Sequence, residues 1–303
     1  MKVSDADDSH WVNRTPERLQ PYLQLSRLDR PVGYWLLALP GWIGLLIPCW
    51  LCRPGWNALW SPVLWAALIL IGAVAMRGAG CTYNDIVDRE LDAQVERTNS
   101  RPLPSGRMSL RQAWTWLLIQ VGVGFLVWLA LPVSTKLVAL GSLPLVAAYP
   151  FMKRVTGFPQ VWLGLTFNWA VLVTFSIKAG GLPGYVWAVY LGLAAWTVGY
   201  DTIYAMQDAE DDALAGIRST ALTFGKRVRT GVAVSYALSI ALLTWGLQAS
   251  TAPRAAVAVL PFAAHLLWQV AALREERALG LFKSNVWAAA LLVAGLVVSQ
   301  VAL

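Results

Sequence analysis

Residues 62–92 read PVLWAALILIGAVAMRGAGCTYNDIVDRELD. Between 62 and 83 the stretch is almost wholly apolar and carries a single charge, Arg77. A helix needs about 20 mainly apolar residues to cross the hydrocarbon core of a bilayer. The stretch therefore predicts a membrane-spanning helix over 62–83 that runs directly into a group of carboxylates.

The rest of the chain repeats this apolar pattern. Of its 303 residues, 57% are hydrophobic and 14% are charged, against roughly 25% charged residues in a typical soluble domain. The sequence predicts an all-α integral membrane protein, with a bundle of about nine transmembrane helices in 31–303. The other expected helices are 33–52, 112–131, 133–151, 160–179, 184–206, 230–248, 253–272 and 285–303.

The N-terminal segment, 1–30, is polar and has no continuous apolar region of the kind that a cleavable signal peptide needs. Pro21 can occupy the first position of a helix. Tyr22, Leu25 and Leu28 would then share one side, which favours an interfacial helix. The charged residues of this piece would be available to lipid headgroups or to a site; they are Arg27, Asp29 and Arg30.

The net charge of +7 does not indicate nucleic acid, because the basic residues lie in short loops between apolar runs. Of the 24 lysines and arginines, twenty fall on one predicted side of the membrane. The other four are Arg53, Lys136, Lys178 and Arg254. By the positive-inside rule the N-terminus lies in the cytoplasm, and nine helices place the C-terminus outside.

All 17 acidic residues fall on the cytoplasmic side or at helix ends facing it. The first acidic motif, 84–92, continues the helix predicted over 62–83. Asp85, Asp88 and Asp92 are spaced i, i+3 and i+7, so their side chains line one helical face, with Asn84 beside Asp88.

The second acidic motif, 201–212, ends the helix predicted over 184–206. Its stripe consists of Asp201, Tyr204, Asp208 and Asp212, with Asp211 beside it. Two unit charges about 5 Å apart repel by roughly 3 kcal/mol at an effective dielectric near 20. Two such stripes at membrane-helix ends need a counter-charge, which hard divalent cations supply through oxygen ligands.

Mg²⁺ commonly joins carboxylates to substrate phosphates, and basic residues beside both motifs suit a diphosphate. Arg77 lies inside an apolar run, where a charge is expensive, so we expect it to be functional. The other candidates for binding substrate are Arg97, Arg101, Lys153, Arg154, Tyr204 and Arg218. Cys49 and Cys52 form a C-x-x-C that we interpret as two small apolar residues near a helix end.

The two motifs together resemble those of the UbiA superfamily of intramembrane prenyltransferases. The first is followed by Arg97-Thr98-x-x-Arg101-Pro102, and the second reads Asp201-x-x-Tyr204-Ala205-x-x-Asp208-x-x-Asp211-Asp212. The stretch at 149–160 is similar to the branch that prenylates 4-hydroxybenzoate. The resemblance spans 27–285.

The resemblance implies a bundle around a central cavity and transfer of a polyprenyl chain from its diphosphate to 4-hydroxybenzoate, an early step of ubiquinone synthesis. The expected location is a bacterial or mitochondrial inner membrane, with the site on the cytoplasmic side and the chain in lipid. Arg77 and Lys153 would contact the diphosphate, and Arg154 the carboxylate of the aromatic acid. Mg²⁺ and diphosphate would be held by Asn84, Asp85, Asp88, Asp208 and Asp212, and Asp92 is a further candidate metal ligand.

Two alternatives stay open. A member of the same superfamily could use another acceptor, such as homogentisate, a naphthoate or haem. A divalent-cation transporter would also carry acids, but transporters usually place them near the bilayer midplane on broken helices. Here they lie at helix ends next to basic residues.

Overall fold

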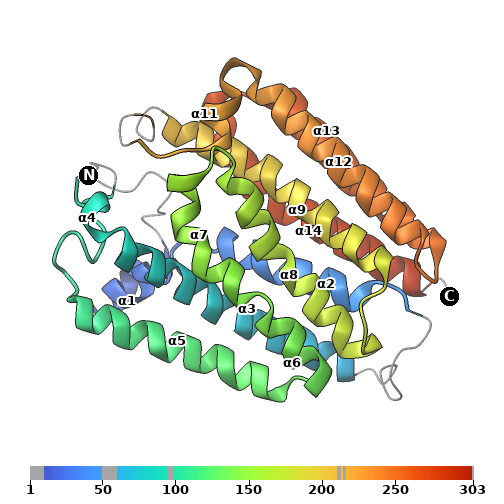
Figure 1. Cartoon of the computed structure of the whole chain (residues 1–303), viewed down its shortest axis with the longest axis horizontal. Helices are drawn as coiled ribbons and strands as arrows, with labels where there is room; N and C mark the ends of the chain where they lie inside the picture. The colour runs from blue at the N-terminus through green and yellow to red at the C-terminus, as the bar shows by residue number, and fades with distance from the viewer. Residues whose placement is uncertain (1–9, 50–59, 95–97, 210–212, 214–215, 302–303) are drawn as a thin grey trace. The chain divides into compact units, whose positions relative to one another are not determined.

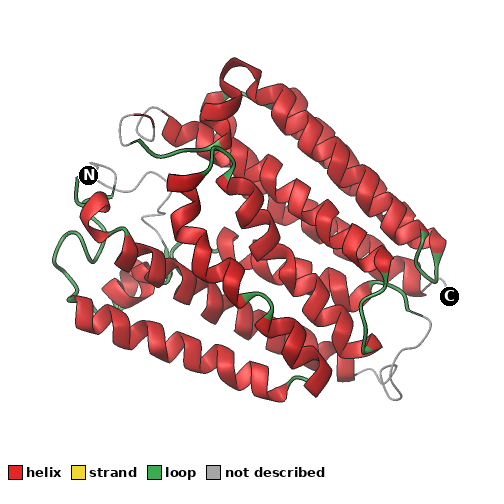
Figure 2. Cartoon of the chain, viewed as in Figure 1, coloured by secondary structure: helices red, strands yellow, loops and turns green. Residues whose placement is uncertain are grey.

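The computed structural model describes residues 10–49, 60–94, 98–209, 213 and 216–301. Within these ranges every regular element is a helix (Figure 2). Seven of the described helices are long and apolar enough to cross a membrane. The all-α, many-helix class predicted from the sequence is confirmed.

The chain divides into two compact units. The first comprises Met1–Trp35 and Leu68–Ala130. It holds η1 (Trp11–Arg14), α1 (Gln20–Leu25), most of α3 (Trp60–Val87), α4 (Arg89–Asp92) and α5 (Leu110–Ala130) (Figure 1). In this unit α3 and α5 approach closely, since a Cβ on Gly124 would lie 2.5 Å from the Met76 sulfur.

The second unit comprises Leu36–Ala67 and Leu131–Leu303. It holds most of α2 (Val32–Leu46) and the start of α3. Its other elements are α6 (Val133–Leu140), α7 (Leu143–Val155), α8 (Pro159–Ala179), α9 (Gly184–Ala205), η2 (Met206–Asp208), α11 (Thr220–Phe224), η3 (Gly225–Arg227), α12 (Val228–Gln248), η4 (Pro253–Ala258), α13 (Val259–Ala272), η5 (Glu275–Arg277) and α14 (Ala278–Val301).

Helix α9 is the buried centre of the second unit and packs against α8 and α12 (Figure 1). Small residues permit these contacts. A Cβ on Gly164 of α8 would lie 2.6 Å from the carbonyl oxygen of Ala194, and one on Gly199 would enter the Tyr236 ring. Close backbone approach at small residues is how membrane helices associate where lipid supplies no hydrophobic drive between them. The position of the second acidic motif is therefore set by a tightly packed helix.

The helix expected over 133–151 is two helices. Helix α6 ends at Leu140, and α7 begins at Leu143 with Pro144 in its first turn. Proline lacks the backbone N–H and its ring clashes with the carbonyl four residues earlier, which is the carbonyl of Leu140. Pro144 therefore ends the first helix and opens the second.

The C-terminal end of α2 is held by a lysine from α8. The Lys178 ammonium donates to the carbonyl oxygen of Leu45 at 2.7 Å and also to that of Ile47. Its side chain is buried, so these carbonyls satisfy its donors and it satisfies theirs. Cys49, a few residues later, is disulfide-bonded, so our interpretation of it as a small apolar residue is wrong. Cys52 lies outside the described residues.

Candidate active site

The first acidic motif is buried in the first unit. Backbone bonds from Asp88 N to Asn84 O (2.9 Å) and from Asp92 N to Asp88 O (2.8 Å) carry the helical register from α3 into α4. Asp85 and Asp88 are each 1% exposed and Asp92 is 7% exposed. Glu90, within the same motif, lies in solvent. The three carboxylates that the sequence places on one face are thus withdrawn from water together.

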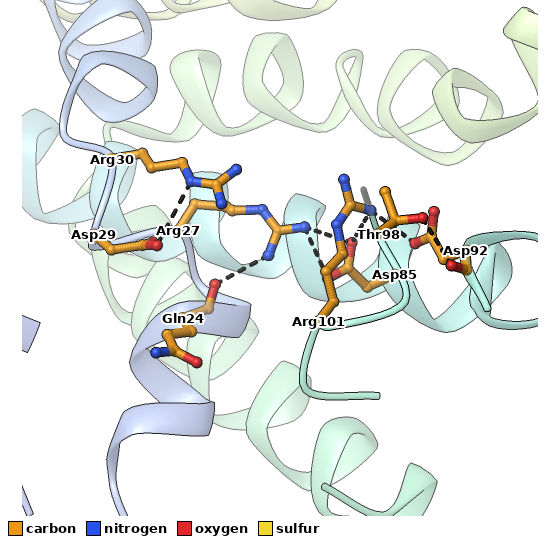
Figure 3. A network of polar contacts seen from close by, with 8 residues as sticks. All are labelled: Gln24, Arg27, Asp29, Arg30, Asp85, Asp92, Thr98 and Arg101. Carbon is orange, nitrogen blue, oxygen red and sulfur yellow. Dashed lines mark hydrogen bonds and ion pairs between the residues drawn. The ribbon is translucent and has the colours of Figure 1, made fainter. Parts of the chain in front are cut away.

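Two arginines pair with carboxylates of this face (Figure 3). Arg27 Nη2 donates to both oxygens of Asp85, at 2.8 and 2.9 Å. Arg101 Nη1 lies 2.7 Å from Asp92 Oδ2 and 3.4 Å from Asp85 Oδ1. Buried carboxylates are stable only when such partners compensate their charge.

Arg27 is the main partner of Asp85, although the sequence left it open between lipid headgroups and the site. Burial is the largest influence and would lower the pKa of its guanidinium, but the charge and hydrogen bond of Asp85 together with the nearby Cys81 and Asp29 outweigh it and leave the pKa raised. Arg27 is therefore charged at every pH at which the protein is folded. The partner is distant in sequence, so no local pattern could have indicated it.

Arg101 is positioned by the loop that follows α4. Thr98 Oγ1 donates to the carbonyl of Asp92 at 2.7 Å, and Arg101 N donates to the carbonyl of Thr98 at 3.0 Å. Arg101 Nε is buried and meets no acceptor among the described residues. A donor held in this way beside carboxylates suits an incoming anion. Arg97, the other arginine expected from this loop, lies outside the described residues.

Arg77 lies in the first unit on α3, where it covers the start of α2. A Cβ on Gly33 would come within 2.6 Å of Arg77 Nε. Only glycine leaves room there, because any side chain would displace the guanidinium. The Arg77 side chain is half-buried with its Nε atom buried, and a functional role for this charge stays a prediction from the sequence.

The second acidic motif begins on the last turns of α9. Asp201 and Tyr204 are half-buried, and the Tyr204 ring lies 4.5 Å from the Phe282 ring of α14. Asp208 is the last residue of η2. Asp211 and Asp212 lie outside the described residues.

Two basic loops meet in the second unit. Arg218 N donates to the carbonyl of Lys153 at 3.0 Å, and its guanidinium donates to the carbonyl of Val155 at 3.1 Å. Gln160 Oε1 accepts a further bond from Thr220 N at 2.9 Å. The chain that follows the second motif is thereby fixed beside Lys153, which is half-buried, and Arg154, which is exposed. The family resemblance implies that these two residues bind the diphosphate and the aromatic acid.

The donor chemistry of the first motif fits a hard divalent cation, because it offers three buried carboxylates and the half-buried amide of Asn84. No three acidic, histidine or cysteine side chains in the described residues converge closely enough to hold a metal by themselves. Asp208 and Asp212 of the second motif, whose side chains are not described, are the other ligands expected from the sequence.

In the described part of the chain, seven apolar helices of membrane-spanning length and a buried acidic motif paired with two arginines define an integral membrane protein that carries a buried cluster of charged side chains. The sequence model of the UbiA prenyltransferase family matches residues 37–289. The chain belongs to this family, which confirms the resemblance found in the two motifs.

Similar proteins align along nearly the whole chain. A 4-hydroxybenzoate octaprenyltransferase of Pseudomonas fluorescens is 37% identical over 290 residues, covering 94% of this chain and 95% of the relative. The mitochondrial 4-hydroxybenzoate polyprenyltransferase of Rattus norvegicus is 42% identical over 297 residues, covering 95% of this chain and 77% of the relative.

Solved structures share the fold. A UbiA homolog from Aeropyrum pernix K1 superposes with a TM-score of 0.71 at 24% identity, covering 90% of this chain and 99% of that one. A UbiA homolog from Archaeoglobus fulgidus bound to GPP and Mg²⁺ gives 0.68 at 20% identity, covering 92% and 99%.

Proposed function

We propose that this protein transfers a polyprenyl chain from polyprenyl diphosphate to 4-hydroxybenzoate, on the ring carbon ortho to the hydroxyl, and releases diphosphate. This is a step of ubiquinone biosynthesis. The observation that carries the proposal is the end-to-end similarity to 4-hydroxybenzoate prenyltransferases from a bacterium and a mammal. The buried acidic motif paired with two arginines supports it chemically.

We assign Mg²⁺ to the carboxylates of both motifs. The proposed ligands are Asn84, Asp85, Asp88, Asp92, Asp208 and Asp212. The A. fulgidus homolog with this fold binds GPP and Mg²⁺, which supports the assignment. When bound, the cation would neutralise charge that develops on the diphosphate leaving group.

Basic residues bind the two substrates in this proposal. Arg77 and Lys153 contact the diphosphate, with Arg97, Arg101 and Arg218 as further cations and Tyr204 as a further contact. Arg154 pairs with the carboxylate of 4-hydroxybenzoate. An arginine matches a carboxylate or phosphate with two parallel hydrogen bonds, so these contacts also fix orientation.

The reaction follows from this placement. The allylic C–O bond breaks, and its electron pair leaves with the diphosphate, whose charge the fixed arginines stabilise. The ring carbon of 4-hydroxybenzoate then supplies the electrons of the new C–C bond. The ring proton passes to Asp201 or to the released diphosphate. A site enclosed by helices would exclude water, which could otherwise capture the allylic cation.

We place the site on the cytoplasmic side of a bacterial or mitochondrial inner membrane, with the prenyl tail in lipid. The twenty-to-four distribution of basic residues between the two predicted sides supports this orientation.

An acceptor panel tests the proposed specificity. Purified protein in liposomes is given polyprenyl diphosphate, Mg²⁺ and one of 4-hydroxybenzoate, homogentisate, a naphthoate or haem. We expect prenylated product with 4-hydroxybenzoate at a rate at least about 100-fold above the others, because each of the others places its carboxylate at a different distance from its reacting carbon, and misplacement of a reacting atom by about 1 Å can cost about 100-fold in rate. Faster transfer to another acceptor would overturn the assignment of 4-hydroxybenzoate and leave the prenyltransferase chemistry standing.

A further inference from the structure

Arg27 contacts the carboxylate oxygens of Asp85 that a metal would bind. Both carboxylate oxygens accept from Arg27 Nη2, and one of them also lies 3.4 Å from Arg101 Nη1 (Figure 3). The two side chains of the Arg27–Asp85 pair are 11% and 1% exposed. Water therefore competes little for this ion pair, and a cation arriving at Asp85 must compete with a guanidinium.

The backbone of Arg27 is held in an uncommon conformation. Its φ is +56°, and it is the one non-glycine residue with a positive φ among those described. Such a conformation costs on the order of 1 kcal/mol or more and persists only where the surroundings enforce it. Within this turn Arg27 N and Arg27 Nη1 both donate to the carbonyl oxygen of Gln24, each at 3.0 Å.

Buried hydrogen bonds of the neighbouring residue, Ser26, hold this turn in place. Its hydroxyl accepts from Trp116 Nε1 at 2.7 Å and from Gln120 Nε2 at 3.2 Å, both on α5. It donates to the carbonyl of Tyr22 at 3.0 Å. We define Ser26, Trp116 and Gln120 as the Ser26 lock.

The face of α3 that contacts the Ser26 lock has a glycine, Gly78, at the point of contact. A Cβ on Gly78 of α3 would lie 2.4 Å from Gln120 Oε1 and 3.1 Å from Ser26 Cβ. Leu25 on the other side is fully buried against Leu103 and Met108. The segment that carries Arg27 is thus docked on α3 and α5 by polar and apolar contacts together. These contacts position the guanidinium beside Asp85.

We propose that Arg27 is a built-in counter-cation of Asp85, which a divalent metal must displace, and that the Ser26 lock positions it for this competition. The inference rests on the proposed function, which brings metal and diphosphate to this motif. Metal alone then binds weakly, because the best-placed carboxylate is engaged. A diphosphate offers the guanidinium an equivalent acceptor with two oxygens, so it frees Asp85 and favours metal binding.

A purely structural ion pair makes the opposite prediction. If Arg27 only held Asp85 in place for the metal, its removal would loosen the ligand and weaken metal binding. The sign of the change in metal affinity therefore separates the two roles.

The test measures Mn²⁺ binding to the full-length protein without diphosphate, by the loss of the free-ion paramagnetic resonance signal. We expect Arg27→Gln to bind Mn²⁺ at least about 10-fold more tightly than the natural protein, since a charge-assisted pair no longer opposes it. Arg27→Lys, which keeps the charge but loses the two-oxygen contact, should fall between them. Arg107→Gln is the matched control, because Arg107 also bonds the Arg27 segment, at Gln24 Oε1, without touching a carboxylate.

Unchanged or weaker Mn²⁺ binding in both Arg27 variants, with the natural protein active in prenyl transfer, would overturn the inference and leave the proposed function intact. Absence of Mn²⁺ binding and of transfer in the natural protein would overturn both. A second readout guards against misfolding. The metal-free Arg27→Lys protein should unfold at a lower temperature than the natural one, and saturating Mn²⁺ should raise its unfolding temperature by more.

Discussion

At the scale of single residues, Asp85 combines burial with contacts to two arginines. It is 1% exposed and lies against both Arg27 and Arg101. A carboxylate so placed has to exchange partners as ligands arrive. In the proposed function the metal replaces the Arg27 guanidinium at Asp85, and the diphosphate becomes the new acceptor for that guanidinium.

Replacement of Asp85 by Asn should reduce turnover by at least about 100-fold, since it removes a negative charge that the proposed metal needs while keeping the side-chain shape. Circular dichroism and detergent gel filtration should show a folded protein, and initial rates at saturating Mg²⁺ measure the loss.

Glu90→Gln is the control from the same motif. The Glu90 side chain is 87% exposed, and its contact with Arg89 is a surface ion pair that contributes little. Its rate should match that of the natural protein. A near-normal rate for Asp85→Asn would remove Asp85 from the proposed metal site.

At the scale of elements, long apolar runs made the helices predictable, and the carboxylate spacing made the common face of the first motif predictable. The break between α6 and α7 was missed, although Pro144 was its local signal. The docking of residues 20–30 could not be foreseen. Their apolar residues on one side of a helix suit a lipid surface as well as a protein surface, and the partner of Ser26 on α5, Trp116, lies 90 residues away in sequence.

The packing of α8 on α9 gives a prediction at this scale. In Gly164→Ala the new methyl group would lie 2.6 Å from the carbonyl oxygen of Ala194, and backbone on both helices would have to move. We expect a loss of about 1–3 kcal/mol in the free energy of unfolding. The measurement is thermal or denaturant unfolding in detergent.

Gly122→Ala on α5 provides the matched comparison, because a Cβ there would meet no atom within 4 Å. Alanine favours helix over glycine by up to about 1 kcal/mol, so this variant should be as stable as the natural protein or more so. Equal destabilisation by the two substitutions would contradict the close α8–α9 contact.

At the scale of the whole molecule, the sequence predicts an odd number of membrane crossings and therefore termini on opposite sides. A fluorescent-protein fusion should report a cytoplasmic N-terminus, and an alkaline phosphatase fusion at Leu303 should be active outside. Phosphatase fused after residue 209 should be inactive, since both acidic motifs are expected at the cytoplasmic face. Active phosphatase at that position would reverse the proposed orientation.

The central claim is that the two acidic motifs serve metal-dependent prenyl transfer to 4-hydroxybenzoate. The most direct measurement uses liposomes that contain the purified protein, ring-labelled 4-hydroxybenzoate and polyprenyl diphosphate, with Mg²⁺ or with EDTA. Label should move into a lipid-soluble product carrying the chain ortho to the hydroxyl, and EDTA should abolish the transfer reversibly. Undiminished transfer in EDTA, or no transfer by folded protein with intact donor, would contradict the account.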